Sequence, residues 1–319
     1  MNCYIKAVLI EAMRNGILKG SQPDNELVEL TRFPWIRVCK EDFDPTFRNP
    51  HPSGVEYTFT MNSISSSQRS HGMLVNSFYE LESTFVDYVN ADSSPKSWCI
   101  GPLCLVKWTP KVYSDEGLKP RWVTWLDHKL EEKCRVLYVA FGSQAEISSE
   151  QLEEIALGLE ESEVSFLWVM RKEEWGVPDG FEERVKGRGM VVREWVDQIE
   201  ILMHGSVEGF VSHCGWNSVL ESVCAGVPIL AWPMMAEQYL NARMVEEEVK
   251  VGLRVETCDG SVRGYVKREG LKKAVMEMME GEKGRKAREK VRELAEMAKL
   301  ATQEGGSSSS TLESLLNQA

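Results

Sequence analysis

The chain has 319 residues, of which 43% are apolar and 27% charged, and its formal net charge is −12 at pH 7. This length suits about two domains of roughly 150 residues each, and the composition is typical of a soluble globular protein. The negative charge argues against a nucleic-acid partner or an anionic membrane surface, because phosphate groups would be repelled. No apolar run approaches the roughly 20 residues needed to span a bilayer, so no membrane span is expected.

The cysteine pattern argues against a zinc site. The eight cysteines form no C-x-x-C pair, and that pairing is the usual sign of a tetrahedral metal site. The first residues also lack the apolar core of a signal peptide. We therefore interpret the cysteines as reduced thiols of a cytoplasmic protein. They are Cys3, Cys39, Cys99, Cys104, Cys134, Cys214, Cys224 and Cys258.

The first 105 residues have an irregular pattern. Apolar spacing predicts an amphipathic helix at residues 7–18, a short buried strand at 72–77 and a helix at 79–88. Residues 106–120 contain two prolines and a glycine among mixed charges, which is typical of a linker.

Regular alternation of strand and helix patterns begins at residue 123. The apolar run at 136–141 is typical of a strand buried on both faces, and Ser148 with Gln151 resembles a capping box. Further strands are predicted at 166–170, 190–193, 209–211 and 227–232, and helices at 217–225 (ended by Gly226), 271–278, 287–298 and, after Gly305, Gly306 and four serines, 312–317. The alternation predicts an α/β fold with a doubly wound parallel sheet, whose ligands sit at the carboxyl ends of the strands.

One turn in this sheet has the composition of a phosphate site. The sequence His213-Cys214-Gly215-Trp216 joins a strand end to a helix that opens with Asn217 and Ser218. A helix N-terminus offers free N–H groups and a positive dipole end, which suit a diphosphate. The alternative is that Asn217 and Ser218 only cap the helix.

Three residues around this turn suit a nucleoside. Glu221 lies one turn beyond Asn217 on the same helix face, where a carboxylate can accept both ribose hydroxyls; the alternative is a solvated glutamate. Trp195 offers a flat ring on which a base can stack, and Gln198 can pair with a base edge. For the tryptophan, the alternative is core packing.

The 44 residues from Trp195 to Gln238 resemble the signature box of plant family 1 UDP-dependent glycosyltransferases. The resemblance implies a GT-B-like fold, with a complete C-terminal Rossmann-like domain (123–319) that binds the UDP-sugar. A linker (106–122) would join it to the last part of an N-terminal, acceptor-side Rossmann-like domain (1–105). The positions that agree in spacing are Trp195, Gln198, His213, Cys214, Gly215, Trp216, Asn217, Ser218, Glu221, Gly226, Pro228 and Gln238.

The resemblance also implies a reaction, in which a sugar passes with inversion from a UDP-sugar to a hydroxyl group of a small lipophilic acceptor, without a metal or other cofactor. The implied binding set comprises Ser143, Trp195, the Val196 backbone, Gln198, His213, Trp216, Asn217, Ser218, Glu221, Glu237 and Gln238. In this set Trp195 stacks on uracil, Glu221 holds the ribose, and Glu237 and Gln238 hold sugar hydroxyls. A glutamine at position 238 goes with glucose donors in the family.

Two positions depart from the family pattern. Glu237 stands where aspartate is usual, and Val196-Asp197 replace a small residue and a proline. The base contact from the Val196 backbone is expected to survive the second change.

The family's catalytic base is a histidine in a Gly-His loop of the N-terminal domain. The first histidine here, His51 in Asn-Pro-His-Pro, does not match that loop, and His71, His128 and His204 are interpreted as surface or packing residues. We therefore assign no catalytic residue and expect an N-terminally truncated family member. It is either an enzyme whose sequence is a fragment or alternative gene model, or a short protein that binds UDP-sugar without catalysis, or a regulatory partner of a full-length relative.

Overall fold

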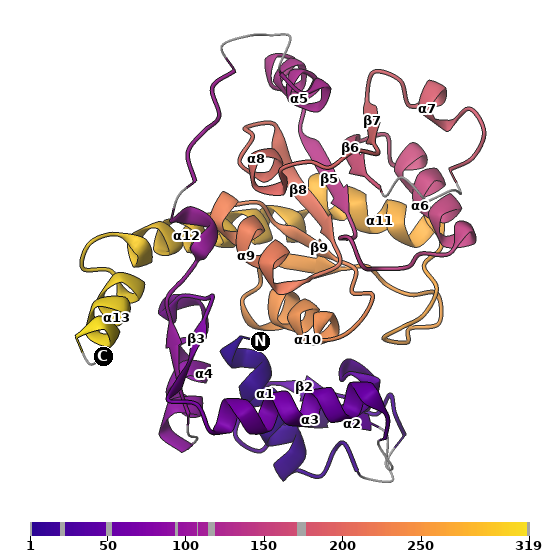
Figure 1. Cartoon of the computed structure of the whole chain (residues 1–319). Helices are drawn as coiled ribbons and strands as arrows, with labels where there is room; N and C mark the ends of the chain where they lie inside the picture. Colours follow the sequence, from indigo (N-terminus) through magenta and orange to yellow (C-terminus); the bar gives the residue numbers. More distant parts are fainter. Residues whose placement is uncertain are drawn as a thin grey trace.

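The structure is a computed structural model that describes residues 2–19, 23–48, 53–92, 95–106, 108–113, 119–170 and 177–317. A large α/β unit contains the main sheet, and the elements of the first 105 residues lie together beside it (Figure 1). The last two helices of the chain extend from the α/β unit back toward the first group of elements.

The main sheet has six parallel strands in the order β10-β9-β8-β5-β6-β7. Strand β5 is buried at all five positions, and its residues alternate between two cores: Leu137 packs with α6 and α11, and Tyr138 with α5 and α8. The strand order reverses between β5 and β8, which is where such sheets bind ligands. The strands are β5 (Val136–Ala140), β6 (Ser165–Val169), β7 (Gly189–Val192), β8 (Val207–Ser212), β9 (Ile229–Ala231) and β10 (Gly252–Arg254).

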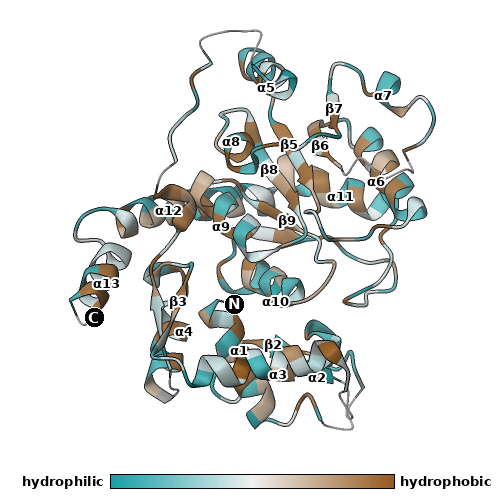
Figure 2. Ribbon diagram, in the orientation of Figure 1, coloured by the Kyte–Doolittle hydropathy of each residue, from teal (hydrophilic) through white to brown (hydrophobic). Residues whose placement is uncertain are grey.

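Helices surround this sheet, with hydrophobic residues toward the strands and hydrophilic residues outside (Figure 2). They are α5 (Arg121–Glu131), α6 (Ser149–Ser162), α7 (Phe181–Arg184), α8 (Gln198–Leu202), α9 (Trp216–Ala225), α10 (Gln238–Arg243), α11 (Arg268–Met279) and α12 (Glu282–Thr302). The last helix, α13 (Ser307–Leu316), packs against α12 away from the sheet. None of the helices in the described ranges is long and apolar enough to cross a membrane.

Within its described residues, the first region contains four helices and two small sheets. Strands β1 (Val28–Glu29) and β2 (Arg37–Val38) pair antiparallel, and β3 (Gly72–Val75) pairs parallel with β4 (Lys96–Cys99). The helices are α1 (Cys3–Arg14), α2 (Pro45–Arg48), α3 (Val55–Gln68) and α4 (Tyr79–Asp92), with short 3-10 turns at Lys40–Asp42 and Leu103–Leu105.

The C-terminal helices share a core with this first region. Val291 and Leu294 of α12 belong to the same buried cluster as Val75 and Phe78. At the start of α13, the Ser308 hydroxyl donates to the carbonyl of Gly101 at 2.5 Å. The domain boundaries predicted from the sequence (1–105, 106–122 and 123–319) stay a prediction. The C-terminal helices contact the first region as well as the α/β unit, so contacts alone do not separate the domains.

The parallel α/β sheet and most of its helices were predicted correctly, but four local predictions need correction. Helix α1 begins at Cys3 rather than residue 7, because the Asn2 side chain accepts the Ile5 N–H and caps it. The strand at 72–75 is not fully buried, since the Leu74 side chain is 62% exposed.

The other two corrections concern helix starts. Ser148 accepts the Gln151 N–H as predicted, but the Gln151 side chain bonds the backbone of Val266, so no reciprocal capping box forms. The four serines after Gly306 are the first residues of α13 rather than a spacer before it.

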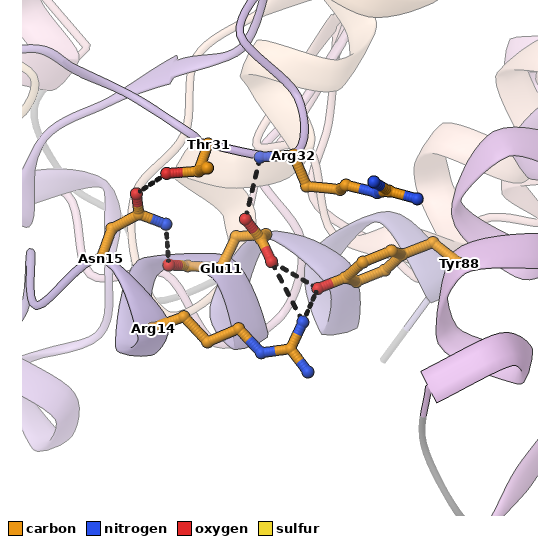
Figure 3. Close-up of polar contacts among 6 residues, drawn as sticks. All are labelled: Glu11, Arg14, Asn15, Thr31, Arg32 and Tyr88. Carbon is orange, nitrogen blue, oxygen red and sulfur yellow. Dashed lines mark hydrogen bonds and ion pairs between the residues drawn. The ribbon is translucent and has the colours of Figure 1, made fainter.

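A buried carboxylate joins three segments of the first region (Figure 3). One oxygen of Glu11 in α1 accepts from the Tyr88 hydroxyl of α4 at 2.5 Å and from Arg14 at 3.3 Å. The other oxygen accepts the backbone N–H of Arg32 at 3.0 Å. Burial alone would raise the pKa of Glu11, but these hydrogen bonds hold it below the ordinary value.

The Glu11 network predicts a pH-dependent contribution to stability. A carboxyl group with a depressed folded-state pKa stabilises the fold above its ordinary pKa of 4.5, and this contribution is lost as the pH falls below that value. We expect Glu11→Gln to lower the unfolding free energy by about 1–2 kcal/mol at neutral pH, with a smaller difference near pH 3.5. Urea unfolding of both proteins across this range measures it, and a pH-independent difference would contradict the assignment.

Candidate functional site

A cavity of about 1230 Å³ lies at the carboxyl ends of β5, β6, β7 and β8. Its walls are the loop after β5 (141–143), the segment after β7 (193–198) and the turn from β8 into α9 (213–218). It therefore occupies the point where the strand order reverses, between β5 and β8.

Nine of the eleven residues in the predicted binding set line this cavity. The two exceptions are Glu237 and Gln238 at the start of α10. The nine are Ser143, Trp195, Val196, Gln198, His213, Trp216, Asn217, Ser218 and Glu221.

The turn between β8 and α9 has a constrained backbone. Cys214 adopts a positive φ of 62°, which is uncommon for a residue with a side chain. Its N–H donates to the Ser212 hydroxyl at 3.1 Å, and its carbonyl accepts the Asn241 side-chain amide at 2.9 Å. These two hydrogen bonds hold the turn in the conformation that starts α9 beside the cavity.

The first turn of α9 has no side-chain cap. Its N-cap is Gly215, so Asn217 and Ser218 lie within the helix rather than at the capping position. The alternative that they only cap the helix is therefore wrong. The uncapped N-terminus leaves backbone N–H groups and the positive dipole end available to an anion.

His213 is held in the turn as a neutral imidazole. Burial lowers its pKa to about 4, so at neutral pH it offers one N–H donor and no charge. A β-carbon added at Gly142 or Gly215 would lie only 2.8 or 2.5 Å from its Nε2 atom. The absence of side chains at both glycines therefore makes room for this ring.

Gln198 bonds two residues of α9 from the predicted binding set, one assigned to the ribose and one to the diphosphate. Its Nε2 donates to a Glu221 carboxylate oxygen at 2.7 Å and to the Ser218 hydroxyl at 2.9 Å. Burial raises the pKa of Glu221, and the Gln198 bond opposes that shift.

Trp195 and Trp216 differ in their surroundings. Trp195 is 90% exposed at the cavity wall, so the alternative that it packs in the core is wrong. Trp216 donates its indole N–H to the backbone carbonyl of Asn76 at 2.7 Å, which connects α9 to the loop after β3.

Lys111 and Tyr113, which precede α5, line the cavity although the sequence did not point to them. Lys111 contacts the carboxylates of Asp197 at 2.7 Å and Glu200 at 2.9 Å, and the Tyr113 hydroxyl donates to Glu200 at 2.6 Å. The hydrogen bond to Asp197 is the largest cause that raises the Lys111 pKa. In the sequence, only Asp197, which replaces the proline usual in the family, pointed to these charged contacts. Lys111 lies in the predicted linker and gave no sign of them.

Gln238 has a structural contact that the resemblance did not predict. Its side-chain oxygen accepts the backbone N–H groups of Met234 and Met235, each at 2.9 Å, and the residue is buried. It thus fixes the turn between β9 and α10, while Glu237 is half-buried next to it.

Comparison with known proteins gives consistent matches. The family model described as "UDP-glucoronosyl and UDP-glucosyl transferase" matches residues 131–296. UDP-glycosyltransferase 90A1 of Arabidopsis thaliana is 55% identical over 323 residues, which cover 100% of this chain and 67% of that protein.

Solved plant structures agree across the whole chain. Glycyrrhiza uralensis UGT73P12, complexed with glycyrrhetinic acid 3-O-monoglucuronide, has a TM-score of 0.86 at 34% identity, covering 100% of this chain and 67% of its own. Phytolacca americana UGT2, complexed with UDP-2-fluoro-glucose and pterostilbene, has a TM-score of 0.81 at 32% identity, covering 99% and 68%.

The packing of His213 against Gly215 predicts the effect of one added methyl group. We expect Gly215→Ala to displace the imidazole and weaken the binding of inorganic diphosphate roughly tenfold, the worth of one hydrogen bond to a charged group. The matched control is Gly205→Ala, whose β-carbon would meet its nearest neighbour at an ordinary 3.4 Å. Calorimetry on both variants, with thermal unfolding as a folding check, measures the difference; equal affinities would contradict the role of His213.

Proposed function

We propose that this chain, which belongs to the plant family 1 UDP-glycosyltransferases, binds a UDP-sugar in the cavity between β5 and β8 and uses it as a glycosyl donor. One observation supports this proposal above all. Residues from the loops after β5, β7 and β8 were predicted to bind the donor, and they converge on a single cavity.

The donor can be placed by the chemistry of the walls. The exposed ring of Trp195 suits the uracil, Glu221 suits the ribose hydroxyls, and the uncapped N-terminus of α9 suits the diphosphate. In the proposed reaction the oxygen of an acceptor hydroxyl bonds the anomeric carbon from the face opposite UDP while the bond from that carbon to the diphosphate oxygen breaks, with inversion. The hydroxyl proton passes to a general base, a role to which no residue of this chain is assigned. Negative charge then grows on the leaving diphosphate, where neutral His213 and the hydroxyls of Ser143 and Ser218 can donate hydrogen bonds.

We further propose glucose as the sugar and small lipophilic alcohols or phenols as acceptors. The proposal of glucose is based on the resemblance at Gln238. Support comes from the complex of Phytolacca americana UGT2 with UDP-2-fluoro-glucose and pterostilbene. Because its oxygen is bound to the backbone, Gln238 would contribute through its Nε2 group or by fixing the turn. The assigned donor residues need no metal, and we propose a cytoplasmic location.

None of the residues in this chain is assigned as the catalytic base. His51 lies outside the described residues. His71 lies beside the Trp98 ring, at 6.0 Å between centroids, and His204 bonds Asp127 at 3.0 Å; neither lines the cavity. The second candidate function is therefore that of a catalytically inactive UDP-sugar-binding partner of a full-length relative.

The proposed uracil platform predicts a large loss of UDP affinity in Trp195→Ala. Base–aromatic stacking contributes about 1–3 kcal/mol, so we expect affinity to fall roughly tenfold to a hundredfold. Trp35→Ala is the matched control, because Trp35 is also largely exposed but lies outside the cavity wall. Calorimetry with UDP measures both variants, and an unchanged affinity in Trp195→Ala would refute the platform.

The lack of an assigned base predicts that these 319 residues bind UDP-sugar but transfer little sugar. General-base catalysis contributes typically about 10²–10⁴-fold, and positioning of the acceptor contributes further. The test incubates the purified chain with UDP-glucose and a panel of phenolic and terpenoid acceptors, and detects glucosides by mass spectrometry. Rapid turnover would show that a base is present, and His51 and His71 would be the first positions to substitute.

A further inference from the structure

Three side chains with metal-binding atoms meet in the first region, outside the walls of the donor cavity. Cys3 is the first residue of α1, Glu82 lies in α4 and Cys99 is the last residue of β4. Their two sulfur atoms and one carboxylate oxygen lie within 4.8 Å of one another. The three residues are buried, at 1%, 1% and 5% exposure. We propose that they form a structural site for one thiophilic divalent cation, with Zn²⁺ as the ion that best suits these ligands.

The ligand set suits such an ion in type and spacing. Zinc is bound by cysteine sulfur at about 2.3 Å and by carboxylate oxygen at about 2.0–2.2 Å in a tetrahedron. Neighbouring ligand atoms in that geometry stand roughly 3.5–3.8 Å apart. The three ligand atoms already lie within 4.8 Å of one another. Rotation of the side chains can bring them to the separations that a tetrahedral site requires.

Hydrogen bonds from the backbone orient the carboxylate of Glu82. One oxygen accepts the Tyr4 backbone N–H at 2.8 Å, as outer hydrogen bonds orient metal ligands elsewhere. The Ser77 hydroxyl and the Cys3 backbone N–H also lie close enough to interact with this carboxylate. Glu82 has non-helical backbone angles inside α4, at φ −131° and ψ 22°. A cation would bind the second oxygen in place of the weaker contact with Ser77, and the Ser77 hydroxyl or a water would complete four ligands.

A bound divalent cation and the nearby Lys6 ammonium group together offset the negative charge of the three ligands. Two thiolates and one carboxylate carry −3, so a divalent cation leaves −1. Lys6 follows Cys3 by one helical turn, and its Nζ donates to the Ser97 hydroxyl at 3.1 Å and the Pro95 carbonyl at 3.3 Å. Its positive charge thus lies on the strand that ends with Cys99 and can offset the remaining negative charge.

The absence of a C-x-x-C pair, which argued against zinc in the sequence, does not bear on ligands supplied by three separate elements.

The site would stabilise the part of the molecule that supports the donor cavity. Asn2, next to Cys3, donates its side-chain amide to Asn241 at 3.0 Å, and Asn241 in turn donates to the Cys214 carbonyl of the β8–α9 turn at 2.9 Å. A cation that joins α1 to α4 and β4 therefore holds the first of these hydrogen bonds in place.

The proposal is tested on the full 319-residue chain, reduced and freed of metal with a chelator. Cd²⁺ is the spectroscopic probe, because cadmium–thiolate bonds absorb in the ultraviolet, and Zn²⁺ competes for the same site. We expect one equivalent of Cd²⁺ to bind with this absorption, Zn²⁺ to displace it and Zn²⁺ to raise the unfolding temperature. Cys99→Ser should weaken binding by roughly a hundredfold or more, because it removes a direct ligand, whereas Cys134→Ser, the matched control, should leave it unchanged.

A measurement on the wild-type chain tests the site without relying on variants, which can fail to fold. X-ray absorption of the zinc-loaded protein should show two sulfur and two lighter ligands at the distances given above. Binding that persists in folded Cys99→Ser, a zinc centre with three or four sulfur ligands, or no stoichiometric binding of either ion would each overturn the site. None of these results depends on the donor cavity, so they leave the proposed glycosyltransferase function untouched.

Discussion

The geometry of the donor cavity depends on one constrained turn, the three residues that connect β8 to α9. Cys214 at positive φ is held by hydrogen bonds from both of its peptide groups, to Ser212 on one side and Asn241 on the other. This conformation places His213 against Gly142 and Gly215 and leaves the first turn of α9 uncapped. If Cys214 adopted the more common negative φ, the N-terminus of α9 would point away from the cavity. The cavity would then lose the backbone N–H groups that can bind an anion.

The first region of the chain supports this turn through buried polar contacts. Asn2 reaches Asn241 directly, and two residues further on Arg243 forms an ion pair with buried Asp42 at 2.7 Å. Removal of one partner from such a pair is usually costly, because the other charge stays buried. Arg263 adds a third contact: it stacks 3.9 Å from the centre of the Tyr239 ring and donates to the backbone carbonyl of Phe43. The elements before residue 105 are therefore part of the framework that positions the donor site.

Sequence periodicity predicted five of the six strands of the sheet and the longer helices that follow them, because parallel strands are buried on both faces, and β5 is an uninterrupted apolar run for that reason. Strand β10 and the short helices α7, α8 and α10 were missed. Nine residues that line the cavity could be predicted, eight of them because a resemblance over 44 residues fixed their spacing; the ninth, Ser143, lies outside that segment. Contacts between distant segments left no comparable pattern. The Lys111 contacts with Asp197 and Glu200, the backbone bonds of Gln238 and the convergence of Cys3 with Cys99 all depend on which loops the fold brings together.

The charges of the cavity limit how it can hold a nucleotide. Among the described residues, the cavity walls carry two cationic side chains, Lys111 and Arg193, and both are paired with carboxylates: Lys111 with Asp197 and Glu200, and Arg193 with Glu182. The described residues that face the predicted diphosphate include no cation, and His213 is neutral there because burial lowers its pKa to about 4. In a chain with a net charge of −12, the attraction that these residues exert on an anionic ligand comes from fixed dipoles at short range, namely the N-terminus of α9 and neutral hydrogen-bond donors. Because such groups act in a partly desolvated site, salt screens them less than it screens surface charges, and binding of the diphosphate should depend more on the geometry of the β8–α9 turn than on ionic strength.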